Sequence, residues 1–182
     1  MDSHHRSSAA ERTSDVLGAG VDAKAVRSRV EEALATSEPV FGRFFLARLL
    51  DLTITYDDET QSTCVELPFA DFLRNPQGSL HGGVIATTMD ISMGHLLNRY
   101  LSAGVTIEMQ MRFFRPVHGP SRCEGRLLRP GKRICHLESR LYDDQDRLAA
   151  YATSSWHRLD SASATRTPPS LRDPDTPDQS PG

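Results

Sequence analysis

Apolar positions follow a helical period in some segments of the chain and a strand period in others. A helix is predicted from residue 23 to about 36, because Asp22 can cap it and Val26, Val30 and Leu34 recur every four residues. The segment at 39–50 fits a short helix or an irregular packed stretch. The most apolar helical segment covers residues 83 to about 100 and should be largely buried. Its stripe consists of Ile85, Met89, Met93, Leu96 and Tyr100.

Strand-like runs lie on both sides of this apolar helix. Two runs, 50–56 and 62–69, are joined by the turn sequence DDET. Four more runs follow the helix and cover 105–113, 121–128, 132–142 and 147–159. Short turns separate them, so the strands should be antiparallel. An α+β fold, with an antiparallel sheet wrapped around the long helix, satisfies this order.

The run 105–113 alternates strictly between apolar and polar residues. Strict alternation predicts two faces of one strand. The apolar face would hold Val105, Ile107, Met109, Met111 and Phe113. Thr106 would then point to the opposite face.

Length and composition predict one folded domain with two tails. The chain has 182 residues, of which 38% are hydrophobic, a share below that of an ordinary globular domain. We expect a disordered arm at 1–21, a folded domain at 22–159 and a disordered, proline-rich tail at 160–182. The formal charge is −3, which favours neither nucleic acid nor an anionic membrane as a partner.

The cysteines and the chain start predict a cytoplasmic protein without a metal. Cys64, Cys123 and Cys135 are odd in number and scattered, so we expect reduced thiols. The start lacks the apolar core of a signal peptide, and no run approaches the ~18 apolar residues of a membrane span. His4 and His5 lie in the polar arm, and no metal-ligand spacing is present.

The glycine pair before the apolar helix is the first candidate for chemistry. Gly82 and Gly83 let the backbone approach a ligand closely, and N–H groups at a helix start have no partner within the helix. Such N–H groups can stabilise the oxyanion that forms when a carbonyl is attacked. The alternative is that the two glycines only ease a tight turn.

Asp90, in the middle of the same helix, is the second candidate. No cationic residue lies three or four positions away, and burying an unpaired carboxylate costs several kcal/mol, roughly. Ala86, Asp90 and Gly94 form a ridge of mostly small side chains that suits close approach by a backbone or ligand. A solvated helix edge is the alternative environment for Asp90.

The spacing of the two candidates predicts an oligomer. Gly82 and Asp90 are eight residues apart, which is about 12 Å along a helix. An aspartate side chain cannot cover that distance. If both residues act on one carbonyl, Asp90 must come from a second copy of the chain, with two helices antiparallel about a two-fold axis.

The segments NPQGSLHGGVIATTMD (75–90) and GVTIEMQMRFFRPV (104–117) closely resemble the PaaI-like, THEM2-like thioesterases. The resemblance covers roughly residues 40–159 and implies a hotdog fold and a tetramer of two dimers. It implies that Asn75 and the Gly82 N–H hold the thioester carbonyl and that Asp90 of the partner activates water or attacks directly. It also implies that His81 supports this loop and that Thr106 assists the attacking water. An ordinary turn residue at Asn75 and a helix-capping His81 are the alternatives.

Several further residues are candidates for substrate binding. Met89, Met93 and Phe113 are candidates to line an acyl pocket beside Gly83, although Met and aromatic residues are more often plain core. Three cationic residues are candidates for the CoA phosphates, although such residues are more often solvated charges. They are Arg115, Lys132 and Arg133.

The resulting hypothesis is an acyl-CoA thioesterase that acts on an aromatic or medium-chain acyl group without metal or bound cofactor. One alternative is a hotdog enoyl-CoA hydratase or dehydratase, which is disfavoured because His81 is embedded in HGG and the carboxylate lies on the helix. A non-catalytic acyl-CoA-binding module is the other alternative. The presence of both Asn75 and Asp90 argues against it.

Overall fold

The computed structural model describes residues 20–159. The predicted tail at 160–182 and all but the last two residues of the predicted arm at 1–21 lie outside the described residues, as do His4 and His5.

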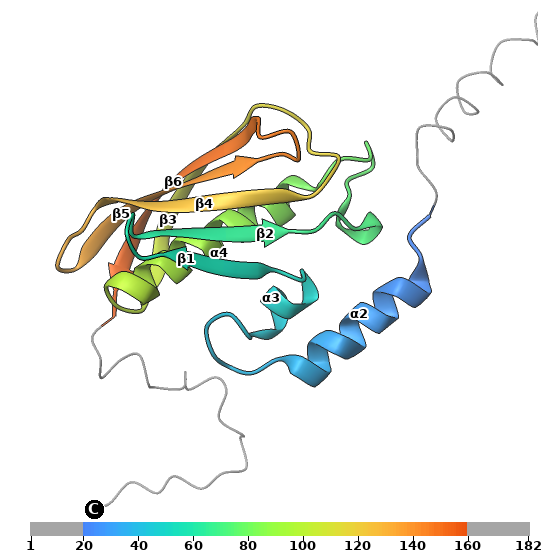
Figure 1. The fold of residues 1–182 in the computed structure, drawn as a ribbon, viewed down its shortest axis with the longest axis horizontal. Helices are drawn as coiled ribbons and strands as arrows, with labels where there is room; N and C mark the ends of the chain where they lie inside the picture. Colours follow the sequence, from blue (N-terminus) through green and yellow to red (C-terminus); the bar gives the residue numbers. More distant parts are fainter. Residues whose placement is uncertain (1–19, 160–182) are drawn as a thin grey trace, which may run out of the picture.

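Six antiparallel strands form one sheet in the order β1-β2-β4-β5-β6-β3 (Figure 1). The strands are β1 (Thr53–Asp57), β2 (Ser62–Leu67), β3 (Gly104–Phe113), β4 (Ser121–Arg129), β5 (Ile134–Tyr142) and β6 (Leu148–Arg158). This confirms the predicted antiparallel pairing. Because β1 and β3 end the order, they are the two edges of the sheet.

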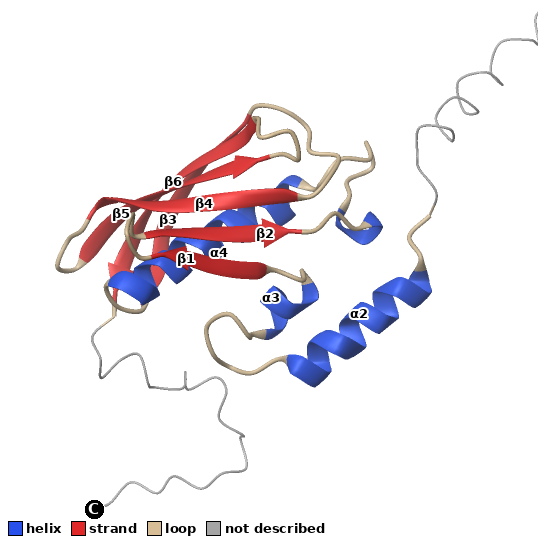
Figure 2. Cartoon of the chain, viewed as in Figure 1, coloured by secondary structure: helices blue, strands red, loops and turns tan. Residues whose placement is uncertain are grey.

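The long helix α4 (Gly82–Tyr100) packs against one face of this sheet, as predicted (Figures 1 and 2). Its apolar stripe faces the sheet and supplies much of the core. The buried members of the stripe are Ile85, Met89, Met93 and Leu96. Burial of this stripe fixes the rotation of α4, and therefore decides which residues its opposite side presents.

Two further helices, α2 (Ala23–Thr36) and α3 (Phe45–Leu49), lie on the β1 side of the sheet (Figure 2). The Asp22 side chain accepts hydrogen bonds from two N–H groups of the first turn of α2, which confirms the predicted cap. The predicted stripe of α2 is wrong at its end. Leu34 is 64% exposed and Ala33 is buried instead, because a four-residue repeat drifts around a helix of 3.6 residues per turn.

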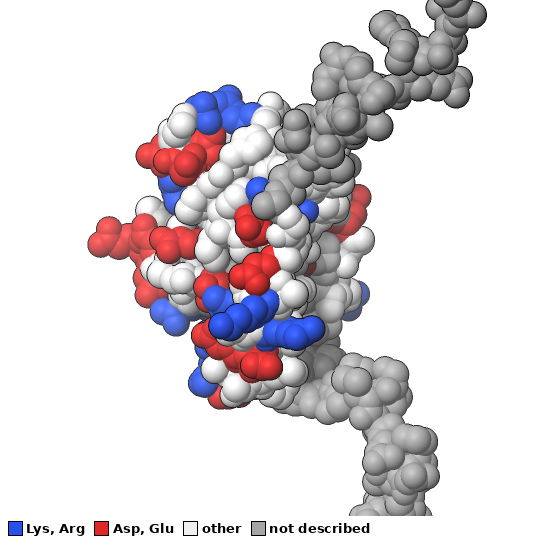
Figure 3. All heavy atoms as spheres, turned by 90° about the vertical axis from the view of Figure 1, so that its right-hand side faces the viewer, with Lys and Arg blue, Asp and Glu red and all other residues white. Residues whose placement is uncertain are grey.

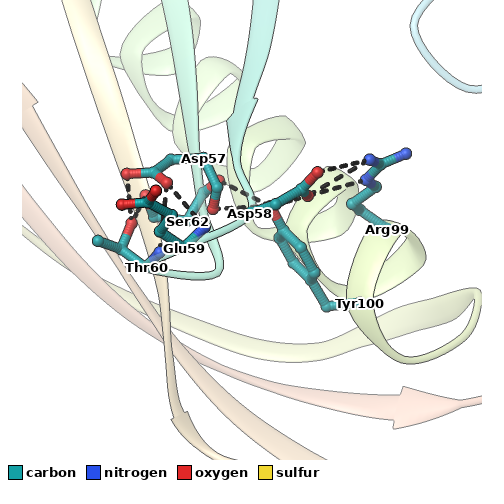
Figure 4. Close-up of polar contacts among 7 residues, drawn as sticks. All are labelled: Asp57, Asp58, Glu59, Thr60, Ser62, Arg99 and Tyr100. Carbon is teal, nitrogen blue, oxygen red and sulfur yellow. Dashed lines mark hydrogen bonds and ion pairs between the residues drawn. The ribbon is translucent and has the colours of Figure 1, made fainter.

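The β1–β2 hairpin holds the C-terminal end of α4 (Figure 4). Arg99 pairs with Asp58 at 3.0 Å, and the Tyr100 hydroxyl donates to the Asp57 carbonyl oxygen at 2.9 Å. The turn at 58–61 consists of the last three residues of the predicted DDET segment and the following glutamine. These contacts fix one end of α4 far from its glycine-rich start.

A β-bulge interrupts β3 between Thr106 and Glu108. Strict alternation is therefore wrong for this strand: the bulge places Thr106 on the same face as Met109, towards α4. Val105 and Ile107 do not join the core and are 50% and 55% exposed. Sequence alternation alone gives no sign of this extra residue.

One face of the molecule carries charges of both signs (Figure 3). Acidic and basic side chains are interspersed on the face drawn in Figure 3, and no large area has one sign. Within the described part of the chain, no helix is long and apolar enough to cross a membrane, and no three acidic, His or Cys side chains are placed to hold a metal ion. Cys123 and Cys135 are buried free thiols, and Cys64 is half-buried.

Candidate functional site

The loop at 75–79 is built around Asn75. Its side-chain oxygen accepts from the N–H groups of Gln77 (3.0 Å) and Ser79 (3.2 Å), and its Nδ2 donates to Ser79 Oγ (2.9 Å). Gly78 has a φ of +84°, a conformation that favours glycine. Asn75 therefore organises this turn, and only one N–H of its amide remains for another acceptor.

His81 caps α4. Its Nδ1 accepts a hydrogen bond from the Gly83 N–H at 2.9 Å, and its carbonyl oxygen accepts from Val84 at 2.9 Å. The Gly83 N–H is thus occupied within the chain. The Gly82 N–H, in contrast, has no acceptor among residues 20–159. Of the two predicted amide donors, only Gly82 can offer its N–H to a ligand.

A cavity of about 370 Å³ opens beside Gly82. Its lining is mostly apolar, with polar groups at Asn75, Ser79 and Arg115. Phe113 borders Gly82 closely: a Cβ at position 82 would lie 3.5 Å from Phe113 Cζ. The cavity thus combines a free backbone N–H, an amide side chain and an apolar wall at the positive end of a helix.

Asp90 is half-buried on the side of α4 that faces away from the core. Thr106 Oγ1 donates a hydrogen bond to Asp90 Oδ1 at 2.8 Å. Asp90 forms no ion pair with any residue of the described chain, as its sequence neighbours predict. Burial raises the pKa of the Asp90 carboxyl above its ordinary value, and the Thr106 hydrogen bond opposes part of that rise.

Replacing Thr106 with Val is expected to raise the pKa of Asp90 further, because the variant loses the hydrogen bond that favours the charged carboxylate. A ¹³C NMR titration of the side-chain carboxyl measures this shift. Thr106→Ser keeps the hydroxyl and should titrate like the unmodified chain. A Val variant whose carboxyl titrates at the same or a lower pH would contradict the role given to this contact.

Three contacts show that α4 runs antiparallel to the edge strand β3. Phe113 lies against Gly82, Thr106 binds Asp90, and Leu97 touches Gly104. Along one α4, Gly82 and Asp90 are about 12 Å apart. One chain therefore holds the two candidate groups at opposite ends of the same stretch of β3, and does not bring them together.

Comparisons with known proteins agree with this fold and with the predicted resemblance. A family model described as the thioesterase superfamily matches residues 77–150. The BH2602 protein of Bacillus halodurans, solved with CoA, superposes with a TM-score of 0.69 at 27% identity, covering 79% of this chain and 97% of that one. A phenylacetic acid degradation-related protein of Ralstonia eutropha superposes with a TM-score of 0.59 at 26% identity, covering 71% of this chain and 98% of that one.

The chain has the hotdog fold, and its residues 77–150 resemble the thioesterase superfamily. It is also similar to SSO2140 of Saccharolobus solfataricus, which carries the name of an esterase, at 29% identity over 71% of this chain and 90% of that protein. In the hotdog fold, α4 is the central helix around which the sheet is wrapped.

Two sets of predicted binding residues do not lie beside Gly82 of the same chain. Met89 and Met93 have no exposed surface, because they face the sheet and not the side of α4 that carries Asp90. They belong to the core and do not line the cavity. Lys132 and Arg133 precede β5, at the end of the sheet where β3 begins, whereas Gly82 lies where β3 ends.

The predicted ridge on α4 is also shifted. Gly94 faces inward, where an added Cβ would lie 3.0 Å from the Trp156 ring. The accessible small residues beside Asp90 are Ala86 and Thr87, with Gly83 one turn earlier. A strip of small side chains therefore leads from the start of α4 to Asp90, and another chain could approach it closely.

Several residues that line the cavity beside Gly82 were not predicted from the sequence. Val117 and Leu80 are brought together by a backbone hydrogen bond of 2.8 Å, and Phe114 follows Phe113 at the end of β3. The FFRPV run was a usable signal, since aromatic side chains bury large areas in cores and interfaces. The 80–117 contact has no local signal, because it joins two loops distant in sequence.

Proposed function

We propose that the protein hydrolyses the thioester of an acyl-CoA to the free acid and CoA, at sites shared between two copies of the chain. The observation that carries the proposal is the half-buried Asp90 carboxylate, which has no cationic partner among residues 20–159 and is held by Thr106. A carboxyl with a raised pKa and no structural ion pair is typical of acid–base sites. The match of residues 77–150 to the thioesterase superfamily supports the reaction class.

The thioester carbonyl oxygen would accept the free Gly82 N–H, with the remaining Asn75 N–H as a second donor. Asp90 of the partner copy would take a proton from water as the water attacks the carbonyl carbon. The carbon–sulfur bond then breaks, and the proton passes to the departing CoA thiolate. Alternatively, Asp90 attacks directly, CoA leaves, and water hydrolyses the resulting anhydride.

Thr106 would act through Asp90. Its proton is already donated to Oδ1, so Oδ2 is left for water, and the Thr106 oxygen can still accept a hydrogen bond. His81 would act through the backbone, by holding the start of α4 so that Gly82 keeps its N–H free. Both residues are positioning residues in this mechanism.

The cavity beside Gly82 is the proposed acyl pocket. Met89 and Met93, the predicted lining residues, are not part of it. Its apolar wall suits an aromatic or medium-chain acyl group, and Arg115 at its border suits the anionic part of CoA. The CoA bound to the B. halodurans protein of similar fold supports CoA as the carrier.

A thiol-release assay over a panel of acyl-CoAs tests the proposal. The panel includes phenylacetyl-CoA and straight chains from acetyl to dodecanoyl, and a maximum is expected among aromatic or medium-chain substrates. Hydration of crotonyl-CoA without release of CoA would instead identify a hydratase. Tight acyl-CoA binding with no thiol released over hours would identify a binding module. Sedimentation of the same samples measures whether the copies form the dimer that the site requires or the tetramer that the resemblance predicts.

A further inference from the structure

The contact between Thr106 and Asp90 depends on the bulge in β3. On β6, Trp156 packs on α4 and Ser154, two residues away, faces the same side of the sheet. Their partners on β3, Thr106 and Met109, are three residues apart, so β3 carries one extra residue. In a regular strand Thr106 would point to the opposite face, and its 2.8 Å hydrogen bond to Asp90 would be lost.

The hydrophobic effect works against this bulge. Val105 and Ile107 are exposed, although both are apolar. Regular alternation would turn both side chains towards α4, on the face that already holds Met109. Because removing apolar surface from water is favourable, the composition of β3 by itself favours the regular strand. Contacts from outside β3 must therefore hold the bulge in place.

Two consecutive serines of β6 hold Glu108, the residue at which pairing resumes after the bulge. Ser154 Oγ donates to the Glu108 carbonyl oxygen at 2.6 Å, and Ser155 Oγ, on the other face of the sheet, donates to Glu108 Oε1 at 3.0 Å. The Ser155 hydroxyl has one proton, so it accepts from His136, whose Nδ1 lies 3.1 Å away. Both serines are buried, which shields these hydrogen bonds from water.

We propose that Ser154 and Ser155 are positioning residues of the Asp90 site, because they fix the bulge that sets Thr106 against Asp90. Within residues 20–159, neither serine hydrogen-bonds to Asp90 or lines the cavity beside Gly82. Their effect therefore passes through the backbone of β3. Its meaning for catalysis rests on the proposed function, whereas its effect on the ionisation of Asp90 requires no substrate.

Ser154→Ala tests the hydrogen bond on the α4 side. The Glu108 carbonyl loses its donor, the bulge relaxes, and Thr106 turns away from Asp90. The pKa of Asp90 should then rise, as in Thr106→Val, and the same ¹³C titration measures it. When Ser154→Ala is combined with Thr106→Val, the upward shift should be smaller than the sum of the two single shifts, because both changes remove one contact.

Two further variants separate positioning from a general loss of stability. Ser154→Thr keeps the hydroxyl and should restore the midpoint of the unmodified chain. Thr63→Val removes another buried hydroxyl, which donates to the Ser92 carbonyl oxygen at 2.9 Å from strand β2. Strand β2 does not pair with β3, so the Asp90 midpoint should stay unchanged in this control.

Glu108 variants test the hydrogen bond on the outer face. Glu108→Gln and Glu108→Ala remove the same charge, but only the glutamine keeps an oxygen that can accept from Ser155. The pKa of Asp90 should be higher in the Ala variant than in the Gln variant. Because the Glu108 side chain is exposed, this pair tests the proposal even if Ser154→Ala does not fold.

The proposal is overturned by any of three results. They are an unchanged Asp90 midpoint in Ser154→Ala, a fully additive double variant, and equal midpoints in the two Glu108 variants. Activity separates the proposal from the proposed function. If Ser154→Ala shifts the Asp90 midpoint while no acyl-CoA is hydrolysed, the positioning role stands and the assigned reaction is wrong. If the unmodified chain releases thiol while that midpoint does not move, the thioesterase assignment stands and the positioning role is wrong.

Discussion

Asp90→Asn is expected to lower acyl-CoA turnover by between about 10²- and 10⁴-fold, the usual contribution of a positioned acid or base. The amide keeps the shape of the side chain and can still accept the Thr106 hydrogen bond, but it cannot take a proton from water or attack a carbonyl. Steady-state thiol release measures the loss. Turnover within about threefold of the unmodified chain would show that another group carries the chemistry.

The same variant should fold at least as stably as the unmodified chain. Burial raises the folded-state pKa of Asp90, so the folded chain binds more protons than the unfolded chain above the ordinary pKa of an aspartate. The stabilisation from this excess of bound protons is present at low pH and is lost as pH rises through the raised folded-state pKa. An uncharged Asn avoids the free-energy cost of burying a charged carboxylate at neutral pH. Thermal unfolding at pH 7 should therefore show an unchanged or higher Tm.

The pH dependence of activity follows from the same shift. The catalytic form is the carboxylate, so kcat/KM should rise with pH through a midpoint above the ordinary pKa of an aspartate. Thr106→Val should move this midpoint further up.

Features set by local residues were predictable from the sequence. The Asp22 cap, the DDET turn and the buried stripe of α4 each depend on neighbours within a few positions, and each was found where expected. The absence of a cation beside Asp90 on its helix was equally predictable, because residues three and four positions apart in the sequence are neighbours on a helix.

Features that depend on contacts between distant segments were not predictable. The bulge at Ile107 carries no glycine or other local signal, yet it decides that Thr106 meets Asp90. Whether Met89 faces a pocket or the core depends on the whole sheet behind it. His81 accepts the Gly83 N–H, which leaves one free amide donor at the start of α4 instead of two. The sequence does not show which of the two N–H groups is occupied.

Gly82→Pro is expected to lower turnover by about 10²- to 10³-fold, the usual cost of losing one oxyanion donor. The position suits proline unusually well. Residue 82 opens α4, where proline is favoured, and His81 has the extended conformation (φ −65°, ψ 134°) that a following proline requires. Proline therefore removes the one free N–H with little effect on the fold.

Gly82→Ala is the matched control, because it adds a Cβ and keeps the N–H. Its Cβ would meet Phe113 Cζ at 3.5 Å, an ordinary contact distance, so its turnover should stay within about tenfold of the unmodified chain. Circular dichroism and the dimer dissociation constant should match in both variants. Equal losses for Pro and Ala would assign the effect to crowding at Phe113, and no loss for Pro would remove the Gly82 N–H from the mechanism.

Mixing the two inactive variants shows whether one site draws on two chains. In a heterodimer of Asp90→Asn and Gly82→Pro, one shared site carries both changes. The other shared site joins an intact Gly82 to an intact Asp90. After subunit exchange, half of the dimers are mixed, so about a quarter of the unmodified activity should return. If each site used Gly82 and Asp90 of the same chain, every site would remain defective and the mixture would stay inactive.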